Sequence, residues 1–201
     1  MEQSRKCGEA KQGTETSHQN KWGWVEASIW TERMLTALEN GVKGGKWFSL
    51  IDKIYSMKAM EESWKQVKSN GGAKGIDKMT IEQFESKAEE YLKEISEALK
   101  AGKYNPQAVR RVYVPKGFGK FRPLGIPTVK DRIVETAMKY ALEPIFENEF
   151  LAISYGFRPN RGCKDALREV DGLIKSGYVW VVDAYLKSYF IKNSVKPYRF
   201  I

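Results

Sequence analysis

The sequence is poor in the residues that build disulfide frameworks and zinc sites. Its 201 residues include two cysteines, Cys7 and Cys163, and a single histidine, His18. Two distant cysteines and one histidine supply neither a set of disulfides nor four zinc ligands. This shortage excludes a disulfide-rich secreted fold and a Cys/His zinc domain, and it favours a reduced, cytoplasmic setting.

Long apolar runs are lacking as well. The sequence has no stretch of about 18 apolar residues that could cross a membrane, and its first residues are polar rather than a basic stub followed by an apolar core. The sequence therefore predicts no membrane partner and no export signal. Residues 1–22 are polar and rich in Gly, Ser and Thr, which predicts a flexible tail.

Positive charge is what the chain has in excess. Its formal net charge is +9, and its apolar content of 42% is enough to build a core. Between residues 101 and 132, eight Lys and Arg residues stand against one acid, Asp131, so this window carries +7 of the +9. Clustered cations bind a polyanion by displacing its counterions. A merely solvated basic surface is the alternative.

Hydrophobic periodicity predicts a helix-rich chain. Thr80 and Gln83 have the spacing of a capping box, and the glycine-rich stretch 71–77 predicts a loop before it. Pro144 is expected to bend or restart the helix that contains it. Apolar residues recur at helical spacing in five stretches, which are 24–40, 47–70, 81–102, 131–150 and 163–177.

Two stretches have the pattern of β-structure instead. Residues 108–127 place β-branched and aromatic residues on both sides of Lys116-Gly117-Phe118-Gly119-Lys120, which predicts a hairpin with a glycine-bearing turn. Residues 178–186 are so apolar that they predict a strand covered on both faces. The expected fold class is therefore α+β.

The predicted hairpin has the composition of a phosphate-binding element. Lys116 near the turn and Arg122 on the returning strand can hold an ammonium and a guanidinium over one groove. Arg110 and Arg111 are expected on opposite faces, because side chains alternate along a strand. The alternative is a solvated hairpin whose cations keep its edges from pairing with other chains.

A series of short motifs extends the hairpin in both directions. The motifs are Asn70 to Asp77, Tyr113 to Lys116, Gly119-Lys120, Arg122 to Thr128, Asp131-Arg132, Ser154 to Cys163 and Val181 to Ala184. In this order and spacing they resemble the bacterial group II intron reverse transcriptases, with the first motif similar to the N-terminal extension of that family. The resemblance covers the chain from about Trp47 to Phe190.

The resemblance implies a right-hand polymerase with fingers and an incomplete palm. The expected parts are an α-rich N-terminal region, a β-hairpin and one central palm strand. By residue number they are a flexible tail (1–22), a helical N-terminal extension and fingers (23–105), the fingers hairpin and helices (106–177), the first palm strand (178–190) and an atypical tail (191–201).

The resemblance also implies roles for individual residues. Lys116 and Arg122 match the residues that hold the nucleotide triphosphate, and Phe190 matches the aromatic that lies under the sugar. A group II intron RNA or an RNA template is the implied partner, with a DNA primer in the intact family, and the oligomeric state stays open. The residues expected to lie along the RNA are Arg110, Arg111, Lys120, Arg158 and Arg161.

One position departs from the family pattern. Polymerases of this kind hold two Mg²⁺ ions with aspartates, and the resemblance places Tyr185 where the family has a metal-binding aspartate. A neutral phenol is a poor ligand for Mg²⁺, which prefers oxygen anions. Asp183 lies roughly 6.5 Å upstream at about 3.3 Å per residue, which is too far to replace it. The chain is therefore expected to have no catalytic aspartate and no metal of its own.

Three interpretations follow from these residues. The first is a truncated group II intron reverse transcriptase that is inactive alone, with a frameshift just after Phe190 as one explanation. The second is a non-catalytic module that binds intron RNA through the same cations. The third is a non-functional remnant that exposes an unpaired strand edge and aggregates.

Overall fold

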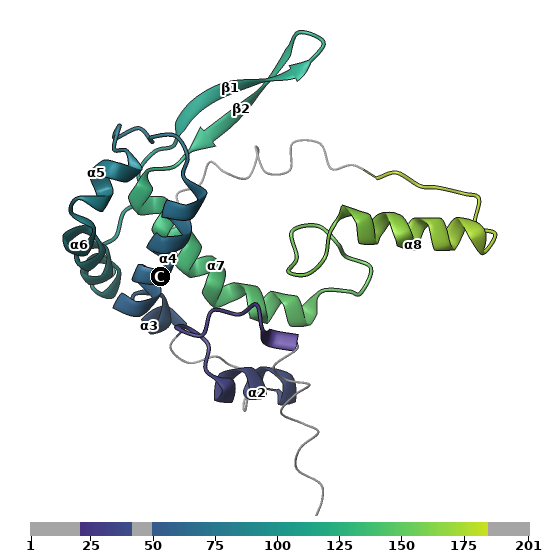
Figure 1. Ribbon diagram of the computed structural model, residues 1–201, viewed down its shortest axis with the longest axis horizontal. Coiled ribbons are helices and arrows are strands. Elements are labelled where there is room, and N and C mark those ends of the chain that lie inside the picture. Colours follow the sequence, from purple (N-terminus) through teal and green to yellow (C-terminus); the bar gives the residue numbers. More distant parts are fainter. Residues whose placement is uncertain (1–20, 42–49, 185–201) are drawn as a thin grey trace, which may run out of the picture. The chain divides into compact units, whose positions relative to one another are not determined.

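The computed structural model describes residues 21–41 and 50–184, which form a mixed α+β fold. Seven helices and one two-stranded antiparallel sheet lie within this described part (Figure 1). The chain divides into two compact units, Met1–Leu151 and Ala152–Ile201. In order, the elements are α2 (Glu32–Asn40), α3 (Leu50–Ile54), α4 (Met57–Asn70), α5 (Ile81–Glu85), α6 (Ala88–Lys100), β1 (Arg110–Gly117), β2 (Lys120–Ile126), α7 (Val129–Glu149) and α8 (Cys163–Lys175).

The core of the first unit is built around α7. This helix contacts α2, α3, α4 and α6, and its small residues Ala137 and Ala141 are fully buried. Their size lets neighbouring helices approach closely, so the helix is covered on more than one side. The indole Nε1 of Trp30 donates a hydrogen bond of 3.0 Å to the carbonyl oxygen of Tyr140, which ties the segment before α2 to α7.

Aromatic packing joins α4, α5 and α6. The ring centroid of Phe84, on α5, lies 4.6 Å from that of Trp64 on α4 and 5.1 Å from that of Tyr91 on α6. Phe84 is fully buried. Tilted rings at such distances add to the apolar area that they bury, so Phe84 holds three helices together.

Most of the predicted helices form, but three of them are shorter or interrupted. The stretch 24–40 is helical only from Glu32, because the side chain of Thr31 caps the helix by accepting from the amide of Met34. The stretch 47–70 splits at Ser56, whose hydroxyl accepts from the amide of Ala59 and starts α4. A polar side chain that satisfies free amides is what begins a helix at these points.

The capping box at Thr80 and Gln83 is confirmed, and it opens α5. The predicted stretch 81–102 then divides, since α5 ends at Glu85 and α6 begins at Ala88. Residues 71–77 form the predicted loop, and Gly71 ends α4 with a φ of 61°, in the region that glycine adopts without strain.

The helix predicted from residue 131 begins slightly earlier and is not interrupted. It runs from Val129 to Glu149 with Thr128 as its N-cap, and it continues through Pro144. The expectation of a restart at this proline was therefore wrong. Within the described residues, no helix is long and apolar enough to span a bilayer.

The strand predicted at 178–186 does not form within the described residues. Residues 178–184 are irregular and exposed, with Trp180 and Val182 more than nine-tenths accessible. A strand needs a neighbour to share its backbone hydrogen bonds, and the described part contains no third strand. Tyr185 and Leu186 lie outside the described residues.

Candidate nucleic-acid interface

The predicted hairpin is confirmed, with its turn at Phe118 and Gly119. β1 and β2 pair antiparallel, Val114 facing Arg122 and Gly117 facing Lys120. Phe118 and Gly119 have φ angles of 50° and 71°, and positive φ at both central residues is what a two-residue turn between twisted strands requires. In Figure 1 the hairpin projects from the helical part of the first unit.

Between Arg110 and Pro115, and between Phe121 and Ile126, the strand register assigns each side chain to one of two faces. Paired residues share a face, and successive residues alternate. The basic face carries Arg110, Val112, Val114, Arg122, Leu124 and Ile126. The aromatic face carries Arg111, Tyr113, Pro115, Phe121, Pro123 and Gly125. Arg110 and Arg111 therefore lie on opposite faces, as alternation predicts.

The two residues predicted to hold a triphosphate lie near each other on the hairpin. Arg122 pairs with Val114, and Lys116 follows Val114 by two residues, at a register shift between Pro115 and Gly117. Both side chains are exposed. The hairpin contains five Lys and Arg residues and no acid between 110 and 126, so its cations are not neutralised from within.

A hollow adjoins the root of the hairpin. It measures about 440 Å³, and its lining includes Arg110 and the glycine loop. The Nε atom of Arg110 is buried and has no hydrogen-bond partner among the described residues. Lys68 and Lys74 also line the hollow, together with one acid, Glu82. Lys68 is paired with Glu85, so Lys74 and Arg110 against Glu82 leave the recess a small excess of positive charge.

A buried carboxylate joins both ends of the hairpin. The Oδ2 atom of Asp131 accepts from the hydroxyl of Thr128, after β2, at 2.7 Å and from the amide of Gln107, before β1, at 3.3 Å. Its Oδ1 atom accepts from the hydroxyl of Tyr104 at 2.7 Å. Asp131 is only 6% exposed. The carboxylate thus fixes the angle at which the hairpin leaves the helices.

The surroundings of Asp131 also keep the phenol of Tyr104 neutral. Burial, followed by the hydrogen bond to Asp131, raises the pKa of Tyr104 far above the ordinary range. A neutral hydroxyl remains a donor to the carboxylate at every physiological pH. The root of the hairpin is therefore held by a bond that does not titrate near neutrality.

Arg132 holds the glycine loop against the end of β2. Its Nη1 atom donates to the carbonyl oxygen of Gly71 at 3.2 Å, its Nη2 atom to that of Ala73, and its Nε atom to that of Pro127 at 3.3 Å. A Cβ on Gly75 would lie 2.7 Å from the Cα of Thr128. The loop therefore packs on the hairpin exit with no room for a side chain at that position.

The sequence did not predict that Asp131 and Arg132 hold the hairpin against the helices. The sequence marked Asp131 and Arg132 as members of the basic window and as one of the short motifs, but with no role in holding the hairpin. The spacing of Thr128 and Asp131, which is that of a capping pair, was the one local signal available. Nothing local marks two carbonyl partners of Arg132, those of Gly71 and Ala73, which lie about sixty residues away along the chain.

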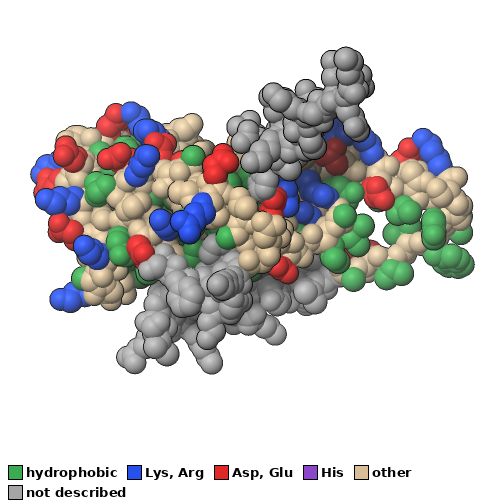
Figure 2. Space-filling model, turned by 90° about the horizontal axis from the view of Figure 1, so that it is seen from below, with side chains coloured by type: hydrophobic (Ala, Val, Ile, Leu, Met, Phe, Trp, Pro, Cys, Tyr) green, Lys and Arg blue, Asp and Glu red, His purple; other side chains and the backbone are tan. Residues whose placement is uncertain are grey.

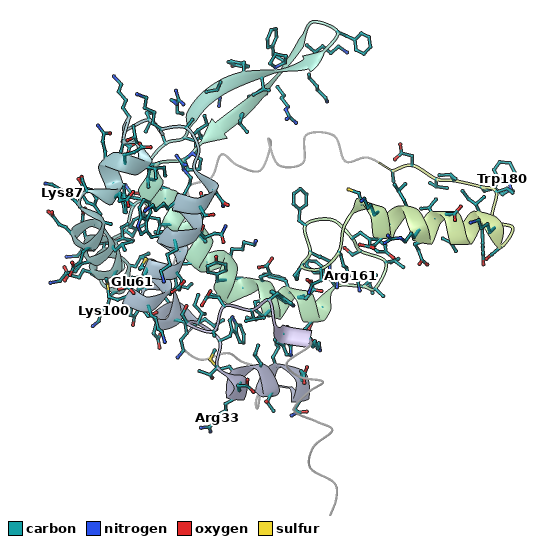
Figure 3. The ribbon with its side chains drawn as sticks, in the orientation of Figure 1. Arg33, Glu61, Lys87, Lys100, Arg161 and Trp180 are labelled. Carbon is teal, nitrogen blue, oxygen red and sulfur yellow. The ribbon has the colours of Figure 1, made fainter. Side chains whose placement is uncertain are left out.

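The other two arginines expected along RNA belong to the second unit. Arg158 is 8% exposed, and its Nη1 atom donates to the carbonyl oxygen of Ser154 at 2.8 Å. Arg161 donates to the carbonyl oxygen of Ala152 and lies 5.5 Å from the ring centroid of Tyr155. Both guanidinium groups thus brace the loop before α8, where Figure 3 labels Arg161. Their role along RNA stays a prediction.

The remaining predicted positions are not brought into a site. Tyr185 and Phe190 lie outside the described residues. Asp183 is described, and it is exposed in an irregular segment. Within the described residues, no three His, Cys, Asp or Glu side chains gather into a group that could hold a metal ion.

Comparison with known proteins shows what the chain is related to. No protein-family model matches it. It is 42% identical over 120 residues to the protein YkfC of Escherichia coli K12, an overlap of 58% of this chain and 32% of the relative. It is 40% identical over 131 residues to the group II intron-encoded protein LtrA of Lactococcus lactis subsp. cremoris. The chain is homologous to group II intron-encoded proteins.

The overlap with LtrA covers 64% of this chain and 21% of the relative. A more distant relative is the COX1/OXI3 intron 1 protein of Saccharomyces cerevisiae, 33% identical over 111 residues, which are 55% of this chain and 13% of that protein. The chain therefore spans about a third or less of the length of these relatives. The resemblance to the group II intron reverse transcriptase and maturase family is confirmed.

Proposed function

We propose that this chain forms the fingers region of a group II intron-encoded reverse transcriptase and binds RNA phosphates through its β-hairpin. The observation that carries the proposal is the hairpin itself, which presents five cations and no acid in a chain homologous to group II intron-encoded proteins. Guanidinium and ammonium groups bind phosphate oxygens through charge-assisted hydrogen bonds. A projecting hairpin that carries these groups therefore suits a polyanion.

Within this proposal the cations of the hairpin have different tasks. Lys116 and Arg122 contact the triphosphate of a nucleotide or the adjacent RNA phosphates. Arg110, beside the basic hollow of about 440 Å³, receives a further phosphate of the strand. Arg111 and Lys120, which are exposed, extend the contact along the RNA.

We further propose that the chain alone does not polymerise DNA. Transfer of a nucleotide requires carboxylates that hold Mg²⁺ at the attacking and leaving oxygens. Tyr185 stands at the position of one such carboxylate, and a phenol with a pKa near 10 stays protonated at neutral pH. Tyr185 does not fit such a Mg²⁺ site, and no group of three His, Cys, Asp or Glu side chains that could hold a metal occurs within residues 21–41 and 50–184. No step of nucleotide transfer is therefore assigned to this chain.

A salt series in a filter-binding assay tests the RNA contact. The full chain is expected to bind a group II intron RNA more tightly than an unrelated RNA of equal length, with affinity that falls steeply as salt rises. A Lys116→Ala, Arg122→Ala double variant is expected to bind more weakly and to lose about one to two units of salt slope.

A matched control removes the same charge elsewhere in the first unit. Lys87 and Lys100 are exposed at the two ends of α6 and are labelled in Figure 3. A Lys87→Ala, Lys100→Ala double variant is expected to keep the salt slope of the unaltered chain. Equal losses for both double variants would show that bulk charge, rather than the hairpin, binds RNA.

Two further results would change the proposal. Templated, Mg²⁺-dependent extension of a primer by the purified chain would contradict the assignment of no polymerase activity. An aggregating chain without a cooperative melting transition, and without preference for any RNA, would identify a non-functional remnant instead.

A further inference from the structure

The aromatic face of the hairpin is a second surface, distinct from the one that carries Arg122. Tyr113 pairs with Pro123, and Phe121 pairs with Pro115, which is the next residue pair on the same face. Tyr113 is 61% exposed and Phe121 is 63% exposed. Two rings from opposite strands thus lie on one open surface, and the hairpin side chains stand out on both sides of the ribbon in Figure 3.

A third exposed ring lies at the tip of the hairpin. Phe118 is completely exposed and adopts a φ of 50°. A positive φ is unfavourable for a bulky side chain, and glycine or asparagine is the usual residue there. The turn would form more easily without this ring, so packing within the hairpin does not account for its presence.

Exposed rings within a cationic surface indicate a particular class of partner. Arg111 is exposed on the same face, and no acid lies anywhere in the hairpin. An apolar protein partner would have to bury these cations, whereas a polyanion neutralises them. Flat rings can in addition stack on bases, but only where the bases are unpaired, because those of a duplex are already stacked on each other.

We propose that the aromatic face binds the unpaired bases of single-stranded RNA, with Tyr113 and Phe121 stacking on bases and Arg111, which lies next to Tyr113 on the side away from Phe121, contacting the adjacent phosphate. This inference rests on the proposed function, since it assigns a second ligand group, the bases, to the hairpin that binds phosphates. The basic face holds phosphates through charge alone, and the aromatic face distinguishes a single strand from a duplex.

Binding to three probes tests the inference with the full chain. The probes are a single-stranded RNA oligonucleotide of mixed sequence, an abasic strand of the same length, and a double-stranded RNA of that sequence. The unaltered chain is expected to prefer the single strand. Tyr113→Leu and Phe121→Leu are each expected to weaken single-strand binding by about tenfold, the size of one lost stacking contact, with no change for the abasic strand.

Two control variants separate stacking from general damage. Tyr113→Phe keeps the ring and is expected to bind all three probes as the unaltered chain does. Phe146→Leu removes a ring that is 54% exposed on α7, away from the hairpin, and is expected to change nothing. Circular dichroism of each variant checks that the exposed substitutions leave the fold intact.

The outcomes distinguish the inference from the function on which it rests. Equal binding of single-stranded and abasic probes by the unaltered chain would overturn the inference and leave the phosphate contact standing. Binding of neither probe would overturn both. If the leucine variants keep their preference for the single strand but abolish self-association in sedimentation, the aromatic face is a protein interface and the inference is wrong.

Discussion

The two units of the chain use similar helices in different ways. α7, in the first unit, buries Ile133, Ala137 and Ala141 completely among four other helices. α8, in the second unit, contains no buried residue, and its Leu167 and Ile174 are more than half exposed. Figure 2 shows hydrophobic side chains of the second unit, in green, gathered on its surface. An amphipathic pattern therefore predicts a helix and an apolar face, but not what covers that face.

The arginines that are expected to lie along RNA also differ between the two units in their exposure and hydrogen bonding. Arg111 and Arg122 of the hairpin are exposed, whereas Arg158 and Arg161 donate hydrogen bonds to carbonyl oxygens of their own loop. A guanidinium bonded to its own loop has fewer donors left for a ligand. The comparison favours the hairpin over the second unit for the proposed contact with nucleic acid, and the predictions below test how far the two units differ.

The largest difference is expected between truncations to alanine in the two units, one of a buried side chain and one of a half-exposed side chain. Phe84→Ala should lower the free energy of unfolding by about 3–5 kcal/mol, because it leaves a cavity against Trp64 and Tyr91. Leu173→Ala on α8 should cost less than about 1 kcal/mol, since Leu173 is already 45% exposed. Urea unfolding followed by circular dichroism measures both. Similar costs would mean that α8 is buried in solution.

A second pair of variants removes a carboxylate from the same position of α7 and of α8. Asp131 and Asp165 are both the third residue of their helix. Asp131→Ala should cost about 2–3 kcal/mol, because the buried hydroxyls of Tyr104 and Thr128 lose their acceptor.

The matching change in α8 should have a smaller effect. Asp165 accepts from the amide of Gly162 at 3.0 Å near the surface, so Asp165→Ala should cost about 0.5–1 kcal/mol. The difference in melting temperature between the two variants measures the contrast. A melting temperature for Asp131→Ala that equals that of Asp165→Ala would show that the carboxylate does not anchor the hairpin.

Glycine substitutions are expected to give a third, smaller difference in stability between the two units. Gly75→Ala should cost about 1–3 kcal/mol, because its Cβ would lie 2.7 Å from the backbone of Thr128. Gly156→Ala, in the second unit, has no atom within 4 Å of the new Cβ and should change stability by less than about 0.5 kcal/mol. Thermal melting compares the two. A harmless Gly75→Ala would mean that the loop can move away from the hairpin exit.

The smallest expected effect is a dependence of stability on pH that Glu135 causes. Loss of hydration, followed by the charge of Asp131, raises the pKa of Glu135. The residue as a whole is exposed, so solvent screening keeps the energy small. A raised pKa means that the folded state binds the proton more tightly than the unfolded state, so ionised Glu135 lowers stability as the pH rises above the ordinary value of 4.5.

Glu135→Gln should therefore raise stability at pH 7 by a few tenths of a kcal/mol. The gain should vanish below pH 4.5, where both states of the unaltered chain hold the proton. Melting temperatures of the variant and the unaltered chain between acidic and neutral pH measure this. A gain that is constant across the range would exclude ionisation as its cause.

Local features of the fold could be predicted from the sequence. The hairpin, its turn and the capping box at Thr80 depend on residues that are neighbours along the chain, so their patterns were sufficient. The breaks at Thr31 and Ser56 were also local, and each residue has the side chain of a helix cap. These breaks were not predicted, because the apolar residues keep their helical spacing across both positions.

Features that depend on distant residues could not be predicted. The apolar run at 178–184 has the composition of a buried strand, but a strand also requires a partner that the pattern does not name. The bonds from Arg132 to the carbonyl oxygens of Gly71 and Ala73, and the bond from the amide of Gln107 to Asp131, arise only when distant segments pack together. For the candidate site, the sequence indicated which hairpin residues are cationic, and the structure added how the hairpin is anchored.

Photo-crosslinking of bound RNA to the full chain tests the central claim most directly. Mass spectrometry of the digested complex identifies the peptides that carry crosslinked nucleotides. We expect them to come from residues 108–127, with Tyr113 and Phe121 among the modified side chains. Crosslinks confined to α8 and the residues after it, with none in the hairpin, would contradict the claim that the hairpin binds the nucleic acid.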